Sequence, residues 1–137
     1  MIVLICVDDN GGVMFTHRRQ SQDRVLRCRV LEKSKGHALW MRPYSLTQFE
    51  GAGQRQIFVD EAYLRKAKLG DYCFVEGTPL TDCEQRIEKL IIYKWNRIYP
   101  ADQWFGLNLG DNGWNLISSY DFKGSSHDRI TEEVYTR

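Results

Sequence analysis

The longest uninterrupted hydrophobic stretch lies at the start of the chain. Residues Ile2 to Val7 are all apolar, and they run directly into the polar turn Asp8-Asp9-Asn10-Gly11-Gly12. Apolar residues that follow one another without alternation predict a strand buried on both faces. We therefore expect residues 2–7 to form a central strand of an α/β sheet. The polar residues after it would then lie at the sheet edge where such sheets bind ligands.

Beyond this strand, short apolar runs alternate with stretches of helical periodicity. Ser21 predicts an N-cap that places Asp23 in the first helical turn, Pro43 closes a strand, and Thr78-Pro79 opens a helix. The predicted elements are a strand at 2–7, a helix at 21–35, a strand at 37–42, a helix at 45–50, a strand at 56–59, a helix at 61–68, a strand at 72–75, a helix at 78–87, a strand at 89–97 and two strands at 114–120 and 130–136. This order predicts an α/β fold: a mainly parallel sheet flanked by helices, with an antiparallel C-terminal strand pair at its edge.

The composition is that of an ordinary globular domain. The chain has 137 residues, of which 42% are hydrophobic and 27% charged, and its net charge is +1. We expect a single domain over residues 1–137, without a global field that would drive binding to nucleic acid or to a membrane. No apolar stretch approaches the roughly 20 residues of a membrane span, and residues 2–7 lack the basic flank of a signal peptide. These features favour a cytoplasmic protein.

The cysteines and histidines lack the spacing of a metal site. No two cysteines form a CxxC pair, and the histidines are far apart in the sequence. We therefore expect reduced thiols and no bound metal. These residues are Cys6, Cys28, Cys73, Cys83, His17, His37 and His127.

Charge is concentrated in one segment. Residues 17–29 hold five arginines and a histidine against a single acid, Asp23. Such a cluster suits RNA, a nucleotide or an acidic protein surface, although a basic helix face is also commonly just solvated. Because no aromatic residues are interleaved with the arginines, we do not expect specific binding of nucleic acid.

Several short motifs occur in an order that resembles the dihydrofolate reductase family. They are Met1-Ile2-Val3-Leu4-Ile5, Asp23 after a polar loop, Leu39-Trp40-Met41-Arg42, Gly53-Gln54-Arg55-Gln56-Ile57, Phe74-Val75-Glu76-Gly77 and the closing pair of strands. The resemblance covers nearly the whole chain, and it implies the dihydrofolate reductase-like fold in a divergent, shortened form.

The resemblance also implies roles for individual residues. Asp23 stands where the family has its active-site acid, and Arg55 stands where an arginine holds the folate carboxylate. Arg42 would face a phosphate or the substrate, and Gly77 and Thr78 would lie against the cofactor NADPH. Without the resemblance, Asp23 reads as a solvated first-turn acid paired with a neighbouring arginine, and Arg55 as a surface charge.

Two departures from the family pattern fall on the expected active site. The apolar wall before the acid is replaced by Thr16-His17-Arg18-Arg19, and the paired glycines at the cofactor diphosphate are replaced by Glu76-Gly77. A carboxylate beside a diphosphate repels it, and a side chain obstructs the close approach that glycine permits.

These departures favour a non-catalytic binding module, regulatory or inhibitory, over an enzyme. Its ligand would be a protein partner, held by His17, Arg18, Arg19 and Arg24 or by the aromatic C-terminal third, or a nucleotide or pterin in the old cleft. In this interpretation no cofactor is required. The alternative is an NADPH-dependent reductase of the dihydrofolate type, in which Asp23 orients the pterin and assists proton delivery.

Overall fold

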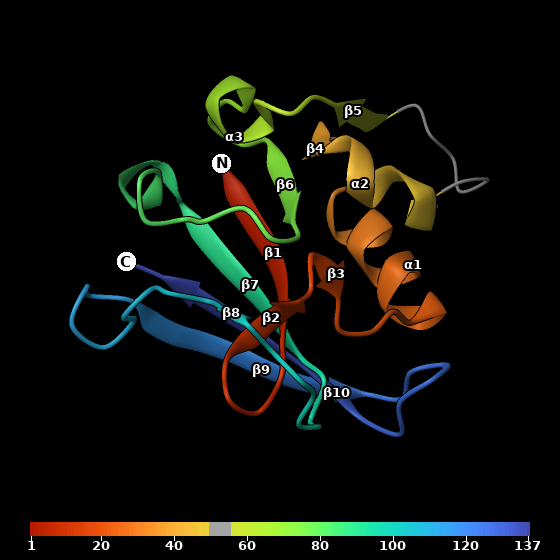
Figure 1. Cartoon of the computed structure of the whole chain (residues 1–137). Helices are drawn as coiled ribbons and strands as arrows, with labels where there is room; N and C mark the ends of the chain where they lie inside the picture. The colour runs from red at the N-terminus through yellow and green to blue at the C-terminus, as the bar shows by residue number, and fades with distance from the viewer. Residues whose placement is uncertain (50–55) are drawn as a thin grey trace.

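The computed structural model describes residues 1–49 and 56–137, and Figure 1 shows how its elements are arranged. The strands are β1 (Ile2–Val7), β2 (Gly12–Phe15), β3 (Arg18–Arg19), β4 (Leu39–Met41), β5 (Ile57–Val59), β6 (Tyr72–Val75), β7 (Lys89–Lys94), β8 (Gln103–Trp104), β9 (Asn115–Phe122) and β10 (Ile130–Thr136). The α-helices are α1 (Arg24–Lys33), α2 (Pro43–Leu46) and α3 (Tyr63–Lys66), and 3-10 turns cover Thr47–Phe49 and Glu84–Arg86.

The first strand lies at the centre of the main sheet, as its unbroken apolar run predicts. The sheet has seven strands in the order β5-β4-β6-β1-β7-β10-β9. β1 runs parallel to both neighbours, with Ile2 opposite Tyr72 on one side and Lys89 on the other. β10 is antiparallel to β7 and to β9, so the terminal strand pair closes one edge. The predicted α/β architecture is confirmed.

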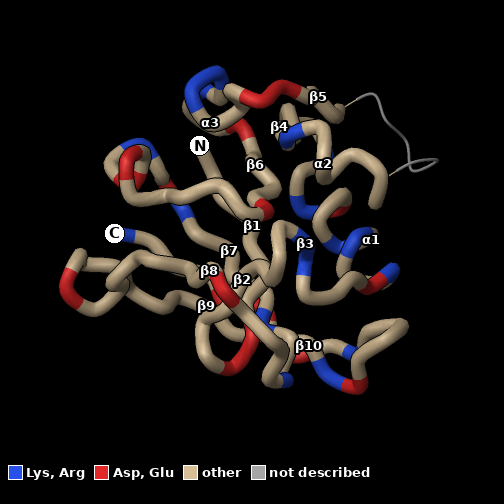
Figure 2. Tube along the Cα trace, in the orientation of Figure 1, with Lys and Arg blue, Asp and Glu red and all other residues tan. Residues whose placement is uncertain are grey.

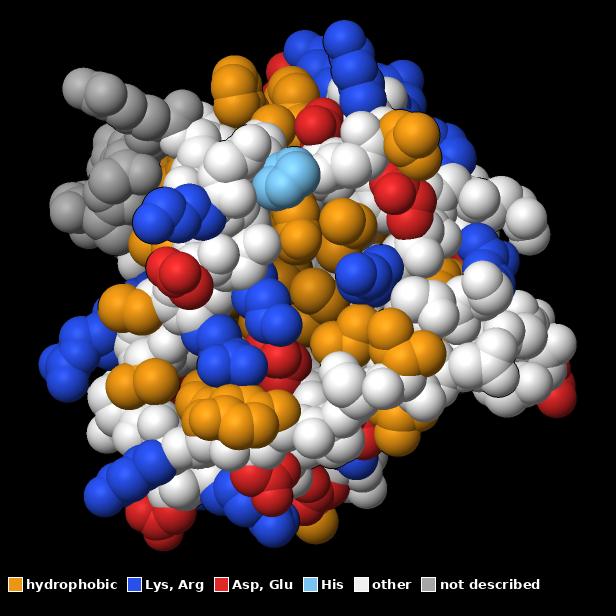
Figure 3. All heavy atoms as spheres, turned by 180° about the vertical axis from the view of Figure 1, so that it is seen from behind, with side chains coloured by type: hydrophobic (Ala, Val, Ile, Leu, Met, Phe, Trp, Pro, Cys, Tyr) orange, Lys and Arg blue, Asp and Glu red, His pale blue; other side chains and the backbone are white. Residues whose placement is uncertain are grey.

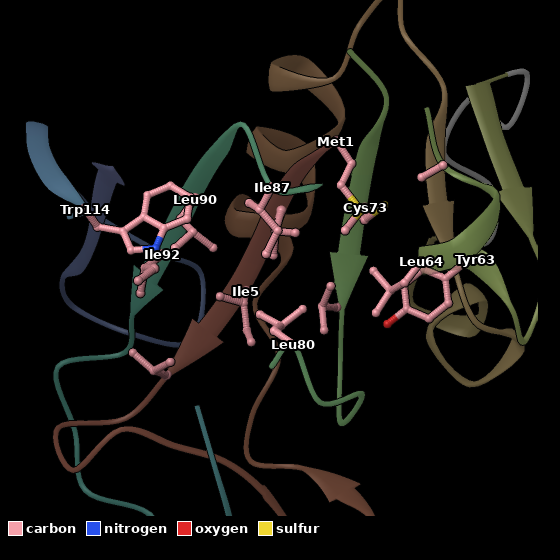
Figure 4. Packing of buried hydrophobic residues seen from close by; sticks show 14 residues of the cluster. Met1, Ile5, Tyr63, Leu64, Cys73, Leu80, Ile87, Leu90, Ile92 and Trp114 are labelled. Atoms are coloured by element: carbon pink, nitrogen blue, oxygen red, sulfur yellow. Dashed lines mark hydrogen bonds between the residues drawn. The ribbon is translucent and has the colours of Figure 1, made fainter. Parts of the chain in front are cut away.

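Both faces of β1 are covered. Val3 and Ile5 point into a cluster with Leu80 and Trp114, which Figure 4 shows together with its neighbours on β6 and β7. Leu4 points the other way, into the cluster beneath α1. Seen from behind, apolar side chains gather in a central hollow bordered by charged ones (Figure 3).

The helix predicted at 78–87 is absent, and this prediction is wrong. Only Glu84–Arg86 makes a 3-10 turn, although Thr78-Pro79 has the sequence of a helix start. Leu80 and Ile87 are 1% and 2% exposed, so both ends of the segment are anchored in the core. We attribute the loss of the helix to this packing, which overrides a local preference of about 1 kcal/mol.

The ends of other helices differ from the predictions as well. Asp23 is itself the N-cap of α1, where Ser21 was expected. Pro43 takes the first position of α2 instead of closing the strand, as its missing N–H allows. α3 is shorter than predicted, and β7 ends before Asn96, whose φ of 59° is incompatible with a continuing strand.

A second, three-stranded sheet in the order β3-β2-β8 lies beside the carboxyl end of β1, and it was not among the predicted elements. β2 and β3 form a hairpin in which Phe15 is opposite Arg18 and Met14 opposite Arg19. The turn residues Thr16 and His17 have φ values of 47° and 61°. Two positive φ angles define the type I′ turn, which strongly favours Asn and Gly. A β-branched threonine there is strained.

Within the described residues no helix is long and apolar enough to cross a membrane. The same residues contain no cluster of side chains that could hold a metal ion. All four cysteines are free thiols; Cys73 is buried and Cys28 is exposed.

Candidate functional site

Asp23 lies at the carboxyl end of the parallel strands and is 2% exposed. One carboxylate oxygen, Oδ1, accepts hydrogen bonds from the backbone amides of Val25 (2.9 Å) and Leu26 (3.1 Å), which cap α1. Oδ1 also accepts the amide of Ser125 (3.1 Å), and Oδ2 accepts the amide of Ser126 (2.8 Å). Asp23 is therefore buried, and among the described residues it pairs with no arginine, contrary to the reading made without the resemblance.

The loop between β9 and β10 closes over this carboxylate. The hydroxyl of Ser126 lies 3.0 Å from Oδ2 and the Nδ1 atom of His127 lies 3.4 Å from it. His127 is buried, with its ring stacked on Trp95 at 4.5 Å and its Nε2 atom 2.7 Å from the hydroxyl of Tyr99. The loop is thus held by the carboxylate on one side and by aromatic packing on the other.

These hydrogen bonds fix the protonation state of Asp23. Burial by itself would raise the pKa of the carboxyl, but donors from Ser126, Ser125 and Leu26 outweigh it and hold the pKa well below its usual range. A carboxylate offers about four acceptor sites. With four backbone amides and a hydroxyl already in place, Asp23 has no acceptor left over for a pterin.

Glu76 is a second carboxylate at the same end of the sheet. It accepts a bidentate ion pair from Arg19, with Nε–Oε2 at 2.9 Å and Nη2–Oε1 at 3.1 Å, and a further hydrogen bond from Gln48 (2.8 Å). Tyr44 lies between two guanidinium groups, 4.4 Å from that of Arg19 and 4.6 Å from that of Arg42. The inner face of the β2–β3 hairpin is thereby held to the residue that directly follows β6.

The residues expected to meet a cofactor follow Glu76. Gly77 has a φ of 80°, its carbonyl accepts a hydrogen bond from Gln103 (2.6 Å), and a Cβ there would come within 2.9 Å of Nη2 of Arg42. Arg42 also donates from Nε to the carbonyl of Glu76 (2.8 Å). The hydroxyl of Thr78 accepts from the hydroxyl of Tyr63 (2.7 Å).

A small cavity of about 120 Å³ lies between this segment and β8. Ile5 and Val13 line it on one side, and Thr78, Pro79 and Trp104 on the other. Its walls are mostly apolar. Ligand pockets for drug-sized molecules measure about 300–1,000 Å³.

The residues predicted for partner binding separate into two groups. His17, Arg18 and Arg24 are exposed and form no ion pair within the described part of the chain. Arg19 is turned inward to Glu76 and is 19% exposed. In Figure 2 the Lys and Arg positions of β3 and α1 lie on the same half of the Cα trace. Arg55, predicted to clamp a carboxylate, lies outside the described residues.

Sequence reasoning missed a buried acid on β10. Glu132 on β10 is 3% exposed and accepts a bidentate ion pair from Arg29, with Nε–Oε2 at 2.7 Å, and contacts from Lys33 and the hydroxyl of Tyr93. Burial alone would raise the pKa of Glu132, but the bond from Arg29 and its other partners lower it. The alternation Ile130-Glu132-Val134 places this acid on the buried side of the strand, and that pattern was the available signal.

Taken together, the order of elements and the order of strands in the main sheet define a dihydrofolate reductase-like fold. The structure of dihydrofolate reductase from Enterococcus faecalis complexed with NADP(H) and RAB-propyl matches it with a TM-score of 0.67. The match covers 99% of this chain and 95% of that one at 13% sequence identity, so it establishes the fold alone. No protein-family model matches the chain, and no curated protein matches it by sequence.

Proposed function

We propose that this chain is a dihydrofolate reductase-like domain that binds a partner protein and performs no hydride transfer. The observation that carries the proposal is the state of Asp23, whose carboxylate oxygens accept bonds from Val25, Leu26, Ser125 and Ser126. An acid that must orient a pterin needs free acceptor positions, and one that assists proton delivery needs a pKa nearer to neutrality. Asp23 meets neither requirement, since its bonds leave no acceptor and lower its pKa.

The cofactor side supports the same proposal. A dinucleotide diphosphate is usually held at the N-terminus of a helix, where unpaired backbone N–H groups point toward it. After Gly77 the chain forms no such helix, and the adjoining carboxylate of Glu76 is already occupied by Arg19 and Gln48. The residues present do not fit the diphosphate of NADPH, and we derive no reaction step through it.

A partner protein fits the molecule better than a pterin or nucleotide in the old cleft. The cavity between Thr78 and Trp104 is about 120 Å³, below the volume of a typical ligand site, whereas a second hollow of about 320 Å³ beside Thr78 is open to solvent and lined by residues of and before α3. By contrast, the strained turn at Thr16 and His17 carries Arg18 outward, and Arg24 opens α1 with its side chain exposed. Backbone strain kept at an exposed turn suggests a functional constraint. The chemistry of this surface suits an acidic protein face.

Binding of NADPH tests the loss of catalysis. A ligand at one hundred times its dissociation constant stabilises a protein by about 2.7 kcal/mol, so a functional cofactor site would raise the melting temperature visibly. We expect no shift at millimolar NADPH, with or without dihydrofolate. A clear shift accompanied by dihydrofolate-dependent oxidation of NADPH would refute the proposal and restore the reductase alternative.

Binding of an acidic probe tests the basic surface separately. We expect a fluorescently labelled polyglutamate peptide to bind the wild-type chain with an affinity that falls steeply with salt. The double variant Arg18→Glu/Arg24→Glu should abolish this binding, and the matched control Arg65→Glu/Lys68→Glu, which alters exposed cations on and after α3, should retain it. Equal loss in both variants would show a non-specific charge effect and would contradict a defined docking surface.

A further inference from the structure

The free edge of the main sheet is unusually exposed. β9 pairs with β10 on one side and forms the outer strand of the sheet on the other. Seven of its eight residues are exposed, among them Leu116 (51%), Ile117 (57%) and Tyr120 (53%). An outer strand presents unpaired backbone N–H and C=O groups, which form a template for another strand.

β9 has few of the features that protect such edges. Proteins commonly protect edge strands with lysines, prolines, short length or bulges. β9 has no lysine and no proline, and Asp121 is its one charged residue. An irregularity opposite Val134 and Tyr135 leaves Ile117 without a partner on β10, but the register from Ser118 to Phe122 is continuous. A regular run of five residues therefore remains available for pairing.

The side chains on this run are held in place before any partner arrives. The guanidinium of Arg29 lies 4.6 Å from the ring of Tyr120 and 5.0 Å from that of Phe122, and the two rings stack at 6.3 Å. Arg29 is itself fixed and neutralised by its bidentate ion pair with Glu132. Ordering side chains usually costs free energy on association, and here much of that ordering is already done.

We propose that β9 pairs with β9 of a second copy of this chain, antiparallel and centred on Tyr120. A two-fold axis perpendicular to the sheet then places Tyr120 opposite Tyr120, Ser119 opposite Asp121 and Ser118 opposite Phe122. The two Asp121 carboxylates do not face each other, because each lies opposite a serine. The sheets of the two copies join into one continuous sheet across the axis.

The sequence of the strand selects this register. A two-fold axis perpendicular to the sheet keeps each side chain on its own face. One residue of β9 must therefore lie directly opposite its own copy across the axis. Centring on Asp121 would place two carboxylates opposite each other, which is destabilising. Centring on Ser119 or Ser118 would bring the bulged Ile117 into the ladder. Centring on Tyr120 confines the central five pairs to the regular run.

We favour a second copy as the occupant because β9 is complementary to itself in this register. Its regular run pairs with the same run of the other copy, and no two carboxylates face each other. Five pairs form a short ladder, so the expected product is a reversible dimer with a dissociation constant of about micromolar order. Leu116 and Ile117 lie just beyond the ladder, and we expect them to add apolar contact at both of its ends.

Sedimentation velocity across a concentration series tests the proposal on the whole chain. We expect the wild type to change from monomer to dimer as its concentration rises. Tyr120→Lys and Tyr120→Glu should each be monomeric, because each places two like charges across the axis. An equimolar mixture of the two should dimerise again, because lysine then faces glutamate.

Two controls keep the test decisive. Leu69→Lys alters a side chain that is 84% exposed and far from β9 in sequence, and it should dimerise as the wild type does. Hydrogen exchange on the wild type should show protection of residues 118–122 that grows with concentration, which requires no variant to fold. A wild type that stays monomeric, a dimer indifferent to both Tyr120 substitutions, or a mixture that stays monomeric would each overturn the proposal.

Discussion

Two carboxylates lie near each other at the carboxyl end of the central strands, and they are held in opposite ways. Burial, and then the charges of Glu76 and Asp23, raise the pKa of the Cys6 thiol between them. Asp23 is held by backbone amides of α1 and of a loop about one hundred residues away. Glu76 is held by the long side chains of Arg19 and Gln48. The first carboxylate is part of the framework, whereas the second is a contact between side chains that can rotate.

The comparison teaches which of the two could still serve a ligand. Releasing Asp23 would leave four backbone N–H groups without acceptors, at a cost of roughly 1–3 kcal/mol for each group that stays buried. Releasing Glu76 requires only that two side chains rotate, those of Gln48 and of Arg19, which is 19% exposed. An anionic partner that attracted Arg19 would therefore disturb the second site and leave the first intact.

The largest effect should come from removing the Asp23 carboxylate. We expect Asp23→Ala to lower the free energy of unfolding by about 3 kcal/mol, because it removes a helix cap and strands the amides of the β9–β10 loop. Urea denaturation followed by circular dichroism measures the change. Asp23→Asn keeps one acceptor oxygen, so its loss of unfolding free energy should be clearly smaller than that of Asp23→Ala. Equal stability of wild type and Asp23→Ala would contradict a framework role.

The next largest effect should come from crowding the same carboxylate. A Cβ on Gly124 would overlap Oδ2 of Asp23 and come within 2.9 Å of Cδ1 of Ile130. We expect Gly124→Ala to cost about 2 kcal/mol by forcing the loop away from the carboxylate. In the control Gly113→Ala, the new Cβ meets nothing within 4 Å, but the φ of 78° is strained, so about 1 kcal/mol is expected. A smaller loss for Gly124→Ala than for this control would show that the loop adjusts freely.

The Asp23 carboxylate should also make the stability of the fold sensitive to acid. Because the pKa of Asp23 is lowered on folding, its contribution is present above the unfolded-state pKa of about 3.9 and is lost as the pH falls toward the folded-state pKa. Asp23→Asn should therefore show a flatter decline of unfolding free energy below about pH 4 than the wild type. The pKa of Glu132 is also lowered, so Glu132 should make its own acid-sensitive contribution to the free energy of unfolding, and this contribution should persist in the variant. If the unfolding free energies of both proteins fell equally below about pH 4, Asp23 would not be the source of the acid sensitivity.

The smallest effect should come from the ion pair of Glu76. A double-mutant cycle with Glu76→Gln and Arg19→Gln should give a coupling free energy of about 1 kcal/mol, since the pair is bidentate but partly exposed. The coupling should fall with added salt, unlike the loss in Asp23→Ala. A coupling above that of a buried pair, about 3 kcal/mol, would remove the contrast between the two sites.

The fold was predictable where local signals and long-range packing agree. The apolar run 2–7 defined the central strand, and the order of elements indicated a parallel sheet with an antiparallel edge. The prediction failed at 78–87, where the packing of Leu80 and Ile87 outweighs a sound helix start. The three-stranded sheet escaped because strands of two residues, such as β3 and β8, are too short to show periodicity.

The candidate site was predictable only in part. The acid and its place near the start of α1 followed from the sequence, but its donors did not, because Ser125 and Ser126 are more than one hundred residues away. Arg19 looked like its exposed neighbour Arg18, and only the pairing of β2 with β3 shows that one points inward and the other outward. Alternation along a two-residue strand depends on a register that no local pattern defines.

The bond between Asp23 and the β9–β10 loop has a consequence for how the chain is made. β1 pairs with β6 and β7, which follow it by about seventy and ninety residues, and Asp23 reaches its last partners later still. Contacts of such high sequence separation slow folding. At a synthesis rate of about 5–20 residues per second, the first strand and helix wait on the order of ten seconds for their neighbours. This strand, which is apolar throughout, is thus made well before the strands that cover it, and its backbone and side chains stay unpaired during that interval.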